Sequence, residues 1–259
     1  MRYSLSALRT LLALAAGAAI AAAAHAETVQ VAVAANFTAP AKALAEVLKK
    51  NTGHEAQLSF GPSGGFYTQI KNGAPFDVFL SADNERPAKL EQEGDTVPGT
   101  RFTYAVGKLA LWSAKEGVVD AEGAVLKSGT FDKIAIANPK LAPYGAAAMQ
   151  TLAALGLTDA IAPKVVTGEN IGQTHNFVAT GNAELGFVAL SQVLEGGKLK
   201  GGSMWEVPAQ HYEPIVQDAV MLKRAEGNPA AKAWMELLRA PETKELLRSF
   251  GYDVKADVK

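Results

Sequence analysis

The chain alternates short apolar runs with helical patterns along most of its length, and this alternation limits the folds open to it. Residues 29–33 (VQVAV) are rich in β-branched side chains, which is typical of a buried strand, and a helical pattern with Pro40 in its first turn follows them. The same order recurs at residues 134–137, which precede a helical pattern at 146–155. Such alternation predicts an α/β fold with largely parallel sheets.

Two extended segments fall outside this alternation. They are residues 108–113 (KLALWS) and 215–222 (IVQDAVML). Each suits a strand that carries the chain from one lobe to another, and each is also apolar enough to be a core strand of one larger sheet. The pattern leaves both arrangements open.

The first 26 residues have the organisation of a secretory signal peptide. Arg2 and Arg9 supply a positive region, residues 11–24 are continuously apolar, and residues 24–26 (AHA) form a small-x-small cleavage site. A membrane anchor is the alternative, but the leucine-rich part is short, and no later segment has the roughly 20 apolar residues of a membrane span. We therefore expect cleavage before Glu27 and export to the periplasm.

Charge and cysteine content exclude several classes of function. Cleavage after residue 26 of the 259 leaves 233 residues with 23 basic and 26 acidic side chains, a net charge of −3. This balance gives no basis for a nucleic-acid or anionic-membrane partner. The chain has no cysteine, which excludes thiol catalysis, cysteine-ligated metals and a lipid anchor on cysteine. A chain of this length can be stable on an ordinary hydrophobic core alone.

Residues 61–65 (GPSGG) match the G-x-S-x-G pattern of a hydrolase nucleophile. A serine nucleophile needs a downstream histidine, and only His211 lies in an expected loop beyond Ser63, because His54 precedes the serine and His175 falls on an expected helix. A secreted serine hydrolase that uses Ser63 and His211 is therefore one alternative. The histidines and carboxylates match no metal-site spacing, and dinucleotide and Walker motifs are absent.

Four expected strand-to-helix junctions share small or neutral polar residues. The first N–H groups of a helix have no intrahelical partner, and the helix dipole favours negative charge at this end. The junctions therefore predict a binding site for a small anion. Side-chain capping alone is the alternative, because Ser, Asn and Gly are common caps. The junctions are residues 35–38 (ANFT), 61–64 (GPSG), 142–145 (APYG) and 168–171 (GENI).

Longer stretches of the chain resemble the molybdate-binding periplasmic proteins of ABC transporters. They include FGPSG (60–64), QIKNGAPFDVFLSAD (69–83), ANPKLAPYG (137–145) and NAELGFVALSQV (182–193), and the resemblance covers essentially the whole chain after the signal peptide. It implies an α/β, two-lobed periplasmic binding protein fold of a type II-like kind, with residues 108–113 and 215–222 as its two crossover strands. Lobe one would comprise residues 27–107 plus 218–259, and lobe two residues 108–217.

The resemblance also implies a set of ligand-binding residues, carried over one position at a time. The donors after the first strand correspond to Ala35 and Asn36, and the serine after the second strand corresponds to Ser63. The middle residue of the P-x-G turn is Tyr144. The aliphatic residue that begins a later helix, and that donates its backbone N–H, is Ile171. Enterobacterial members have a small residue in the turn and a tyrosine in the later strand, where this chain has Ala189. A second branch of the family shares the arrangement found here, so one tyrosine hydroxyl still serves the ligand.

The function that this resemblance implies is that of a periplasmic solute-binding protein, not an enzyme. We expect a monomer that closes its lobes over molybdate or tungstate and delivers the anion to the membrane permease of an ABC transporter. The metal would be held through its oxygens by Asn36, Ser63, Tyr144 and Ile171, with no direct metal ligand and no cofactor. A fully ionised anion needs donors only, so Glu169 should point away from the site. A receptor for sulfate or another oxyanion is the alternative within this class.

Overall fold

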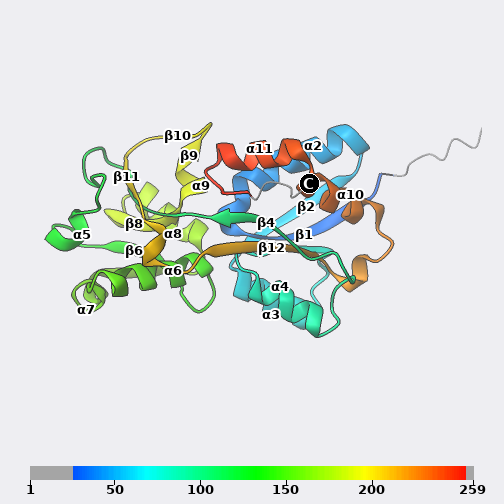
Figure 1. Ribbon diagram of the computed structural model, residues 1–259, viewed down its shortest axis with the longest axis horizontal. Helices are drawn as coiled ribbons and strands as arrows, with labels where there is room; N and C mark the ends of the chain where they lie inside the picture. Colours follow the sequence, from blue (N-terminus) through cyan, green and yellow to red (C-terminus); the bar gives the residue numbers. More distant parts are fainter. Residues whose placement is uncertain (1–25, 255–259) are drawn as a thin grey trace, which may run out of the picture.

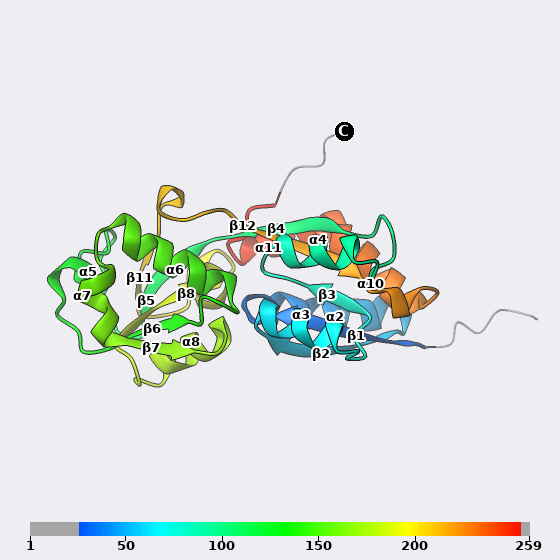
Figure 2. The same ribbon diagram turned by 90° about the horizontal axis from the view of Figure 1, so that it is seen from below.

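The computed structural model describes residues 26–254 and places them in two lobes that lie side by side along the longest axis of the molecule (Figure 1, Figure 2). Each lobe is a five-stranded mixed sheet with helices on both faces. The α/β, two-lobed fold expected from the sequence is therefore confirmed. The expected signal peptide lies outside the described residues, apart from Ala26. Within residues 26–254, none of the helices combines the length and the apolar character of a membrane span.

The first lobe is built on a sheet with the strand order β2-β1-β3-β12-β4. Strand β1 pairs in parallel with β2 and β3, whereas β12 pairs antiparallel with β3 and β4. Because β12 comes from far along the sequence, the chain returns to this lobe after building the other. The strands are β1 (Thr28–Ala34), β2 (Glu55–Gly61), β3 (Val78–Leu80), β4 (Phe102–Gly107) and β12 (Ile215–Met221).

Side-chain alternation decides which helices cover each face of this sheet. Val29, Val31 and Val33 of β1 are buried in one core, and Ala32 packs in the opposite core with Phe79. Helices α2, α10 and α11 cover the first face and α3 and α4 the second, above and below the sheet in Figure 1. Their bounds are α2 (Thr38–Thr52), α3 (Ser63–Lys71), α4 (Glu85–Gln92), α10 (Pro229–Arg239) and α11 (Pro241–Ser249).

The second lobe has a sheet of the order β11-β5-β8-β6-β7, in which β6 is parallel to β7 and β8. Helix α6 packs on one face, and α8 and α9 pack on the other. The short helices α5 (Val125–Ser128) and α7 (Thr158–Ile161) and the hairpin β9 (Leu194–Glu195) and β10 (Lys198–Leu199) complete the lobe. The other elements are β5 (Leu109–Ser113), β6 (Ile134–Ala137), β7 (Val165–Gly168), β8 (Leu185–Ala189), β11 (Ser203–Glu206), α6 (Pro143–Ala154), α8 (Ile171–Ala179) and α9 (Leu190–Val193).

Two connections join the lobes. Strand β4 ends at Gly107 and β5 begins at Leu109, so the single residue Lys108 separates the first sheet from the second. On its return the chain enters β12, whose first residue, Ile215, pairs with Gly107. Both expected crossover segments are thus strands beside the connections, with β12 belonging to the first sheet. The exact residues that divide the lobes, at 107/108 and 217/218, stay a prediction.

The C-terminal segment is tied back to the connection between the lobes. Val106 and Asp253 exchange two backbone hydrogen bonds, of 2.8 and 3.0 Å. This pairing holds Tyr252 in the interior, where its ring packs edge-on against Phe37 at 5.7 Å between ring centres. A residue near the end of the chain therefore brings a hydroxyl into the space between the lobes.

The core of the first lobe gives a direct test of this packing. Leu44 in α2 is 1% exposed and Val47, one turn away on the same helix, is 37% exposed. We expect Leu44→Ala to lower the free energy of unfolding by roughly 2–5 kcal/mol, because it leaves a cavity among packed side chains. Urea denaturation measures the change, and Val47→Ala is the matched control, with an expected loss below about 1 kcal/mol. Equal losses in the two variants would contradict the placement of α2.

Candidate functional site

Four helices begin around one buried space between the lobes. The helix η1 (Ala35–Phe37) follows β1, α3 follows β2, α6 follows β6 and α8 follows β7, so the four junctions expected from the sequence meet at the facing ends of the two sheets. The cavity is small, ≈ 10 Å³, which is about the space that one water molecule needs. Its lining, which has no charged residue, is Ala34, Ala35, Asn36, Gly61, Pro62, Ser63, Ala82, Ala142, Pro143, Tyr144 and Ile171.

Three of these four helix N-termini have no side-chain cap. No side chain accepts a hydrogen bond at the beginning of η1, α3 or α6, whereas the Asn170 side chain accepts from the Gln173 N–H at α8, at 3.0 Å. Capping therefore explains the polar residue at one junction only. At the other three, no side chain caps the positive end of the helix dipole, which lies at the cavity wall.

Ser63 is the first residue of α3, and its side chain is 1% exposed. Its hydroxyl oxygen accepts a hydrogen bond of 2.9 Å from the Ala82 N–H. A hydroxyl that accepts one bond still has its own proton to donate. The Ala82 contact therefore fixes the oxygen and leaves the Ser63 proton available for donation to a ligand in the cavity.

Tyr144 enters the site from the second lobe, as the residue after Pro143 at the beginning of α6. The missing N–H of Pro143 costs nothing at this position, because a first helical N–H has no partner in any case. The Tyr144 hydroxyl accepts a hydrogen bond of 3.0 Å from Gln217 Nε2. Burial, with Tyr252 and Tyr104 close by, raises the pKa of Tyr144 well above its usual range, so the hydroxyl keeps its proton.

Asn36 lines the cavity with its amide engaged elsewhere. Its Nδ2 donates to Gln217 Oε1 and to the Tyr252 hydroxyl, both at 2.9 Å. Its backbone oxygen accepts from the Ser191 hydroxyl of the second lobe, also at 2.9 Å. Its side-chain oxygen, Oδ1, is buried and has no hydrogen-bond partner among the described residues. Asn36 is thus held from both lobes, with one unsatisfied polar atom.

Ala35 and Ile171 contribute backbone groups and apolar side chains to the lining of the cavity. Ala35 begins η1, and Ile171 begins α8, with its side chain buried against the core that spans both lobes. The Ile171 carbonyl accepts from Gln192 Nε2 at 3.0 Å, which fixes the first turn of α8. All five residues expected at the site therefore line the same cavity, although their binding of a ligand stays a prediction. Glu169 is exposed and is not among the lining residues.

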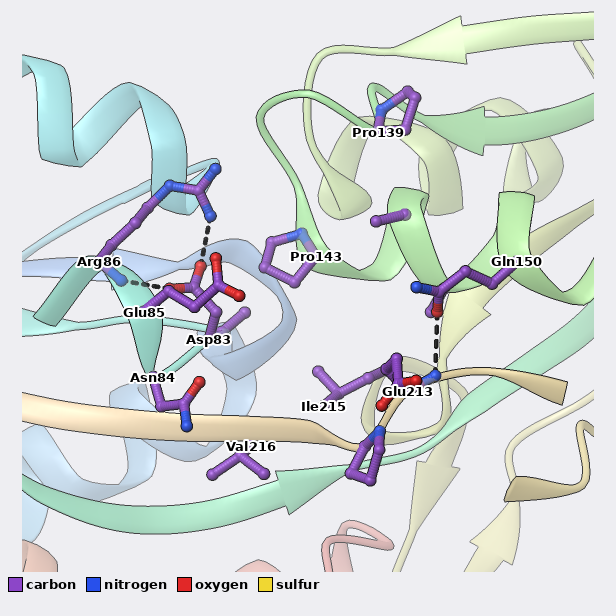
Figure 3. Close-up of a pocket in the computed structure, with 14 residues that line it drawn as sticks. Asp83, Asn84, Glu85, Arg86, Pro139, Pro143, Gln150, Glu213, Ile215 and Val216 are labelled. Carbon is purple, nitrogen blue, oxygen red and sulfur yellow. Dashed lines mark hydrogen bonds and ion pairs between the residues drawn. The ribbon is translucent and has the colours of Figure 1, made fainter. Parts of the chain in front are cut away.

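A second pocket lies beside the first and also spans the lobes (Figure 3). Arg86 of the first lobe pairs with Asp83 and also donates to the Lys140 carbonyl of the second lobe, at 3.3 Å. Next to it, the Gly64 N–H donates to the Leu141 carbonyl at 2.9 Å. These contacts fasten the lobes together at the rim of the cavity, and nothing in the sequence patterns indicated them.

The sequence interpretation also missed the residues behind the cavity. Tyr104, Ser191, Gln217 and Tyr252 are buried and hydrogen-bonded to Asn36, to Tyr144 or to one another. Only Gln217 gave a signal, because it begins a polar pair in the otherwise apolar segment 215–222. The other three stand in segments whose pattern is that of an ordinary strand or helix end.

The hydrolase alternative finds no support in this geometry. In the described part of the chain, Ser63 has no hydrogen bond to His211, whose ring lies 6.3 Å from Trp205 between ring centres. The elbow-like GPSGG segment instead precedes and begins a helix at a small cavity with an uncharged lining. No three acidic or histidine side chains among the described residues are grouped to hold a metal ion directly.

Comparison with known proteins defines the class. The model of a family described as bacterial extracellular solute-binding proteins matches residues 29–253, so this chain belongs to that family, whose members bind solutes and are not enzymes. A curated relative, the molybdate-binding protein ModA of Azotobacter vinelandii, is 60% identical over 255 residues, 98% of this chain and 100% of the relative. The ModA of Rhodobacter capsulatus is 54% identical, with 94% of each chain covered.

A solved structure agrees with this class. The periplasmic molybdate-binding protein of Azotobacter vinelandii superposes with a TM-score of 0.85 at 44% identity, over 88% of this chain and 100% of the other. Both the order of the secondary-structure elements and the family are therefore shared with proteins that are named for molybdate binding.

The buried tyrosines predict how stability responds to alkaline pH. Burial raises the pKa of Tyr104, Tyr144 and Tyr252 above the usual value near 10. Their contribution to stability is therefore complete below about pH 10 and is lost as the pH rises further, because the unfolded chain releases these protons first. We expect the free energy of unfolding to fall above pH 10 by up to about 1.4 kcal/mol per pH unit for each tyrosine.

Urea titrations between pH 8 and 11.5 measure this slope. Tyr252→Phe should remove its share of the slope, about 1.4 kcal/mol per pH unit, because one titrating group is lost. A Tyr252→Phe protein with the slope of the unaltered protein would show that this hydroxyl is not buried as described.

Proposed function

We propose that this protein captures molybdate between its two lobes in the periplasm and delivers it to the membrane permease of an ABC transporter. The observation that carries the proposal is the cavity lined by uncharged residues of both lobes, with three uncapped helix N-termini around it. Ala35, Asn36 and Ser63 belong to one lobe and Tyr144 and Ile171 to the other. The names and the identity of the relatives support molybdate as the ligand.

The donor set suits a fully ionised tetrahedral anion. Molybdate, tungstate and sulfate carry no proton near neutral pH and need only donors, whereas phosphate keeps a proton and needs an acceptor. The lining has no carboxylate to supply one. Each hydrogen bond to a charged group contributes about 1.5–3 kcal/mol, and each helix dipole about 0.3–1 kcal/mol. Several of them together can hold a dianion without lysine or arginine.

Size and lobe closure complete the selection. A cavity closed around molybdate leaves the smaller sulfate with longer and weaker hydrogen bonds. Tungstate is nearly the same size as molybdate, and we propose that the site accepts both. Neither lobe alone has all the donors, so the anion stabilises the state in which the lobes are closed. The movement is a hinge at the two connections, at Lys108 and just before Ile215.

Substitution of Ser63 tests the binding role. Ser63→Ala removes a buried donor from the cavity and should weaken molybdate binding by roughly 1–3 kcal/mol, or about five- to 150-fold. Calorimetric titration with molybdate, tungstate, sulfate and phosphate measures the affinity of each anion. Ser59→Ala is the matched control, because Ser59 is an exposed residue on the adjacent strand β2. Heat from sulfate alone would contradict molybdate as the ligand.

Substitution of Gly64 tests closure separately. A Cβ atom on Gly64 would lie 3.1 Å from the Leu141 Cα and 3.2 Å from its carbonyl oxygen, both backbone atoms of the opposite lobe. Gly64→Ala should therefore favour the open state, which lowers molybdate affinity and raises the radius of gyration of the loaded protein in X-ray scattering. Gly65→Ala is the control, because its Cβ would meet only the Pro62 side chain of the same lobe. Unchanged affinity in Gly64→Ala would contradict the closed contact.

A further inference from the structure

A buried polar network connects the two lobes behind the cavity. Its centre is a pair of side-chain amides, Asn36 and Gln217, which is surrounded by the hydroxyls of Tyr104, Tyr144 and Tyr252. Gln217 and Asn36 are 0% and 2% exposed, so bulk solvent does not reach their side chains. In an interior of this kind each donor and acceptor needs a partner from the protein, an ordered water or a ligand.

Gln217 is directed into this network by an irregularity in its strand. The pairing of β12 with β4 shifts register between Gln217 and Asp218, and such bulges commonly redirect a side chain. Gln217 Oε1 accepts from Asn36 Nδ2 and from the Tyr104 hydroxyl, each at 2.9 Å, and Gln217 Nε2 donates to the Tyr144 hydroxyl at 3.0 Å. One amide of the first sheet thus accepts from two donors of its own lobe and donates to a hydroxyl of the other lobe.

One polar side-chain atom of this network has no partner in the described part of the chain. Asn36 Oδ1 is buried without a partner among the described residues, and Asn36 lines the cavity. A carbonyl oxygen at this place would repel a dianion, whereas an N–H there would attract it. The present orientation of the Asn36 amide is therefore the unfavourable one for an anion.

Rotation of both amides by 180° removes this conflict without moving any other heavy atom, provided that the hydroxyl protons of Tyr144 and Tyr252 turn with them. Asn36 Oδ1 then takes the place from which Nδ2 now contacts Gln217 and Tyr252, and it accepts from Gln217 Nε2. The Tyr252 proton, which now points to the Asn36 backbone oxygen or the Ser191 hydroxyl, each at 3.0 Å, turns to Asn36 Oδ1, while the Ser191 hydroxyl continues to donate to that backbone oxygen. Gln217 Oε1 then faces the Tyr144 hydroxyl and accepts its proton. Tyr104 keeps a partner for its own proton in the Ser81 carbonyl, at 3.0 Å. Asn36 Nδ2 becomes the atom that has no partner within the protein.

The two amides must rotate together. If Asn36 alone rotated, its Oδ1 would stand against Gln217 Oε1 at the present 2.9 Å with no proton between them. If Gln217 alone rotated, two N–H groups would face each other. Gln217 therefore decides whether the Asn36 amide or the Tyr144 hydroxyl donates to the cavity, and the two donations exclude each other.

We propose that Gln217 is a positioning residue for oxyanion binding: the bound anion selects the arrangement in which both amides are rotated, and Gln217 then holds Asn36 Nδ2 toward the anion. This inference rests on the proposed function. In the bound state, Tyr144 serves the anion through its backbone N–H, and its hydroxyl proton belongs to Gln217. A ligand selects one of two states by its different affinity for them, and a dianion distinguishes N–H from carbonyl at contact distance.

A double-mutant cycle with molybdate as the probe tests this role. In Gln217→Glu both carboxylate oxygens at position 217 accept hydrogen bonds. The side chain therefore continues to accept from Asn36 Nδ2, and Asn36 Oδ1 stays directed at the cavity. We expect a loss of molybdate affinity of roughly ten- to a hundredfold from Gln217→Glu in the unaltered background. In the Asn36→Ala background the same substitution should cost no more than about threefold, since its effect passes through Asn36.

Gln57→Glu adds the same charge at an exposed glutamine of β2 and should leave the affinity unchanged. Equal losses from Gln217→Glu in both backgrounds would show that Gln217 acts by charge or by packing, and would overturn its positioning role. Absence of heat from any oxyanion with the unaltered protein would instead overturn the proposed function, and this inference with it.

Nuclear magnetic resonance of the unaltered protein gives a second test that requires no variant to fold. Without anion, the Gln217 side-chain NH₂ protons should show nuclear Overhauser effects to the Tyr144 ring. With saturating molybdate, the Gln217 NH₂ protons should show nuclear Overhauser effects to the Tyr104 ring instead. The signals of the Asn36 NH₂ group should shift. Contacts of the Gln217 NH₂ group to Tyr144 that persist in the molybdate complex would contradict the paired rotation.

Discussion

Uncapped helix N-termini of two lobes that face one buried space are the feature on which the rest of this structure depends. Their N–H groups have no intrahelical partner, and at η1, α3 and α6 no side chain caps them. In an interior of low dielectric constant such donors favour an anion strongly, and they do so without a buried cation. In the proposed function, binding and closure are one process, because the donors converge only when the lobes meet.

The same interior links the site to the connections between the lobes. Gln217 lies on the strand by which the chain returns to the first lobe, Tyr144 opens a helix of the second, and Tyr252 is fixed by the pairing of Asp253 with Val106. Asn36 contacts this group through its side chain and its backbone oxygen. In the proposed function, a change of protonation or orientation in one side chain of this network consequently alters which hydrogen-bond donors face the anion.

Much of the fold could be predicted from the sequence because its signals are local. Strands and helices follow from apolar periodicity, and the four junctions follow from where a helix must begin. The resemblance to molybdate-binding proteins selected the five site residues within these junctions, and all five line one cavity. The supporting residues could not be predicted in this way. Gln217, Ser191 and Tyr252 lie 181, 155 and 216 residues from Asn36 in the chain, and their contacts exist only once both lobes have formed. The contacts of Gly64 and Arg86 across the lobes are non-local for the same reason.

The most direct test of the central claim is an anomalous-difference map at the molybdenum absorption edge, from crystals grown with molybdate. The account predicts a single strong peak inside the cavity. The oxygens of the anion at this peak should lie within hydrogen-bond distance of Ser63 and of the backbone N–H groups of Tyr144 and Ile171. A peak in the neighbouring pocket beside Arg86 and Asp83, or bound anion touching one lobe only, would contradict it.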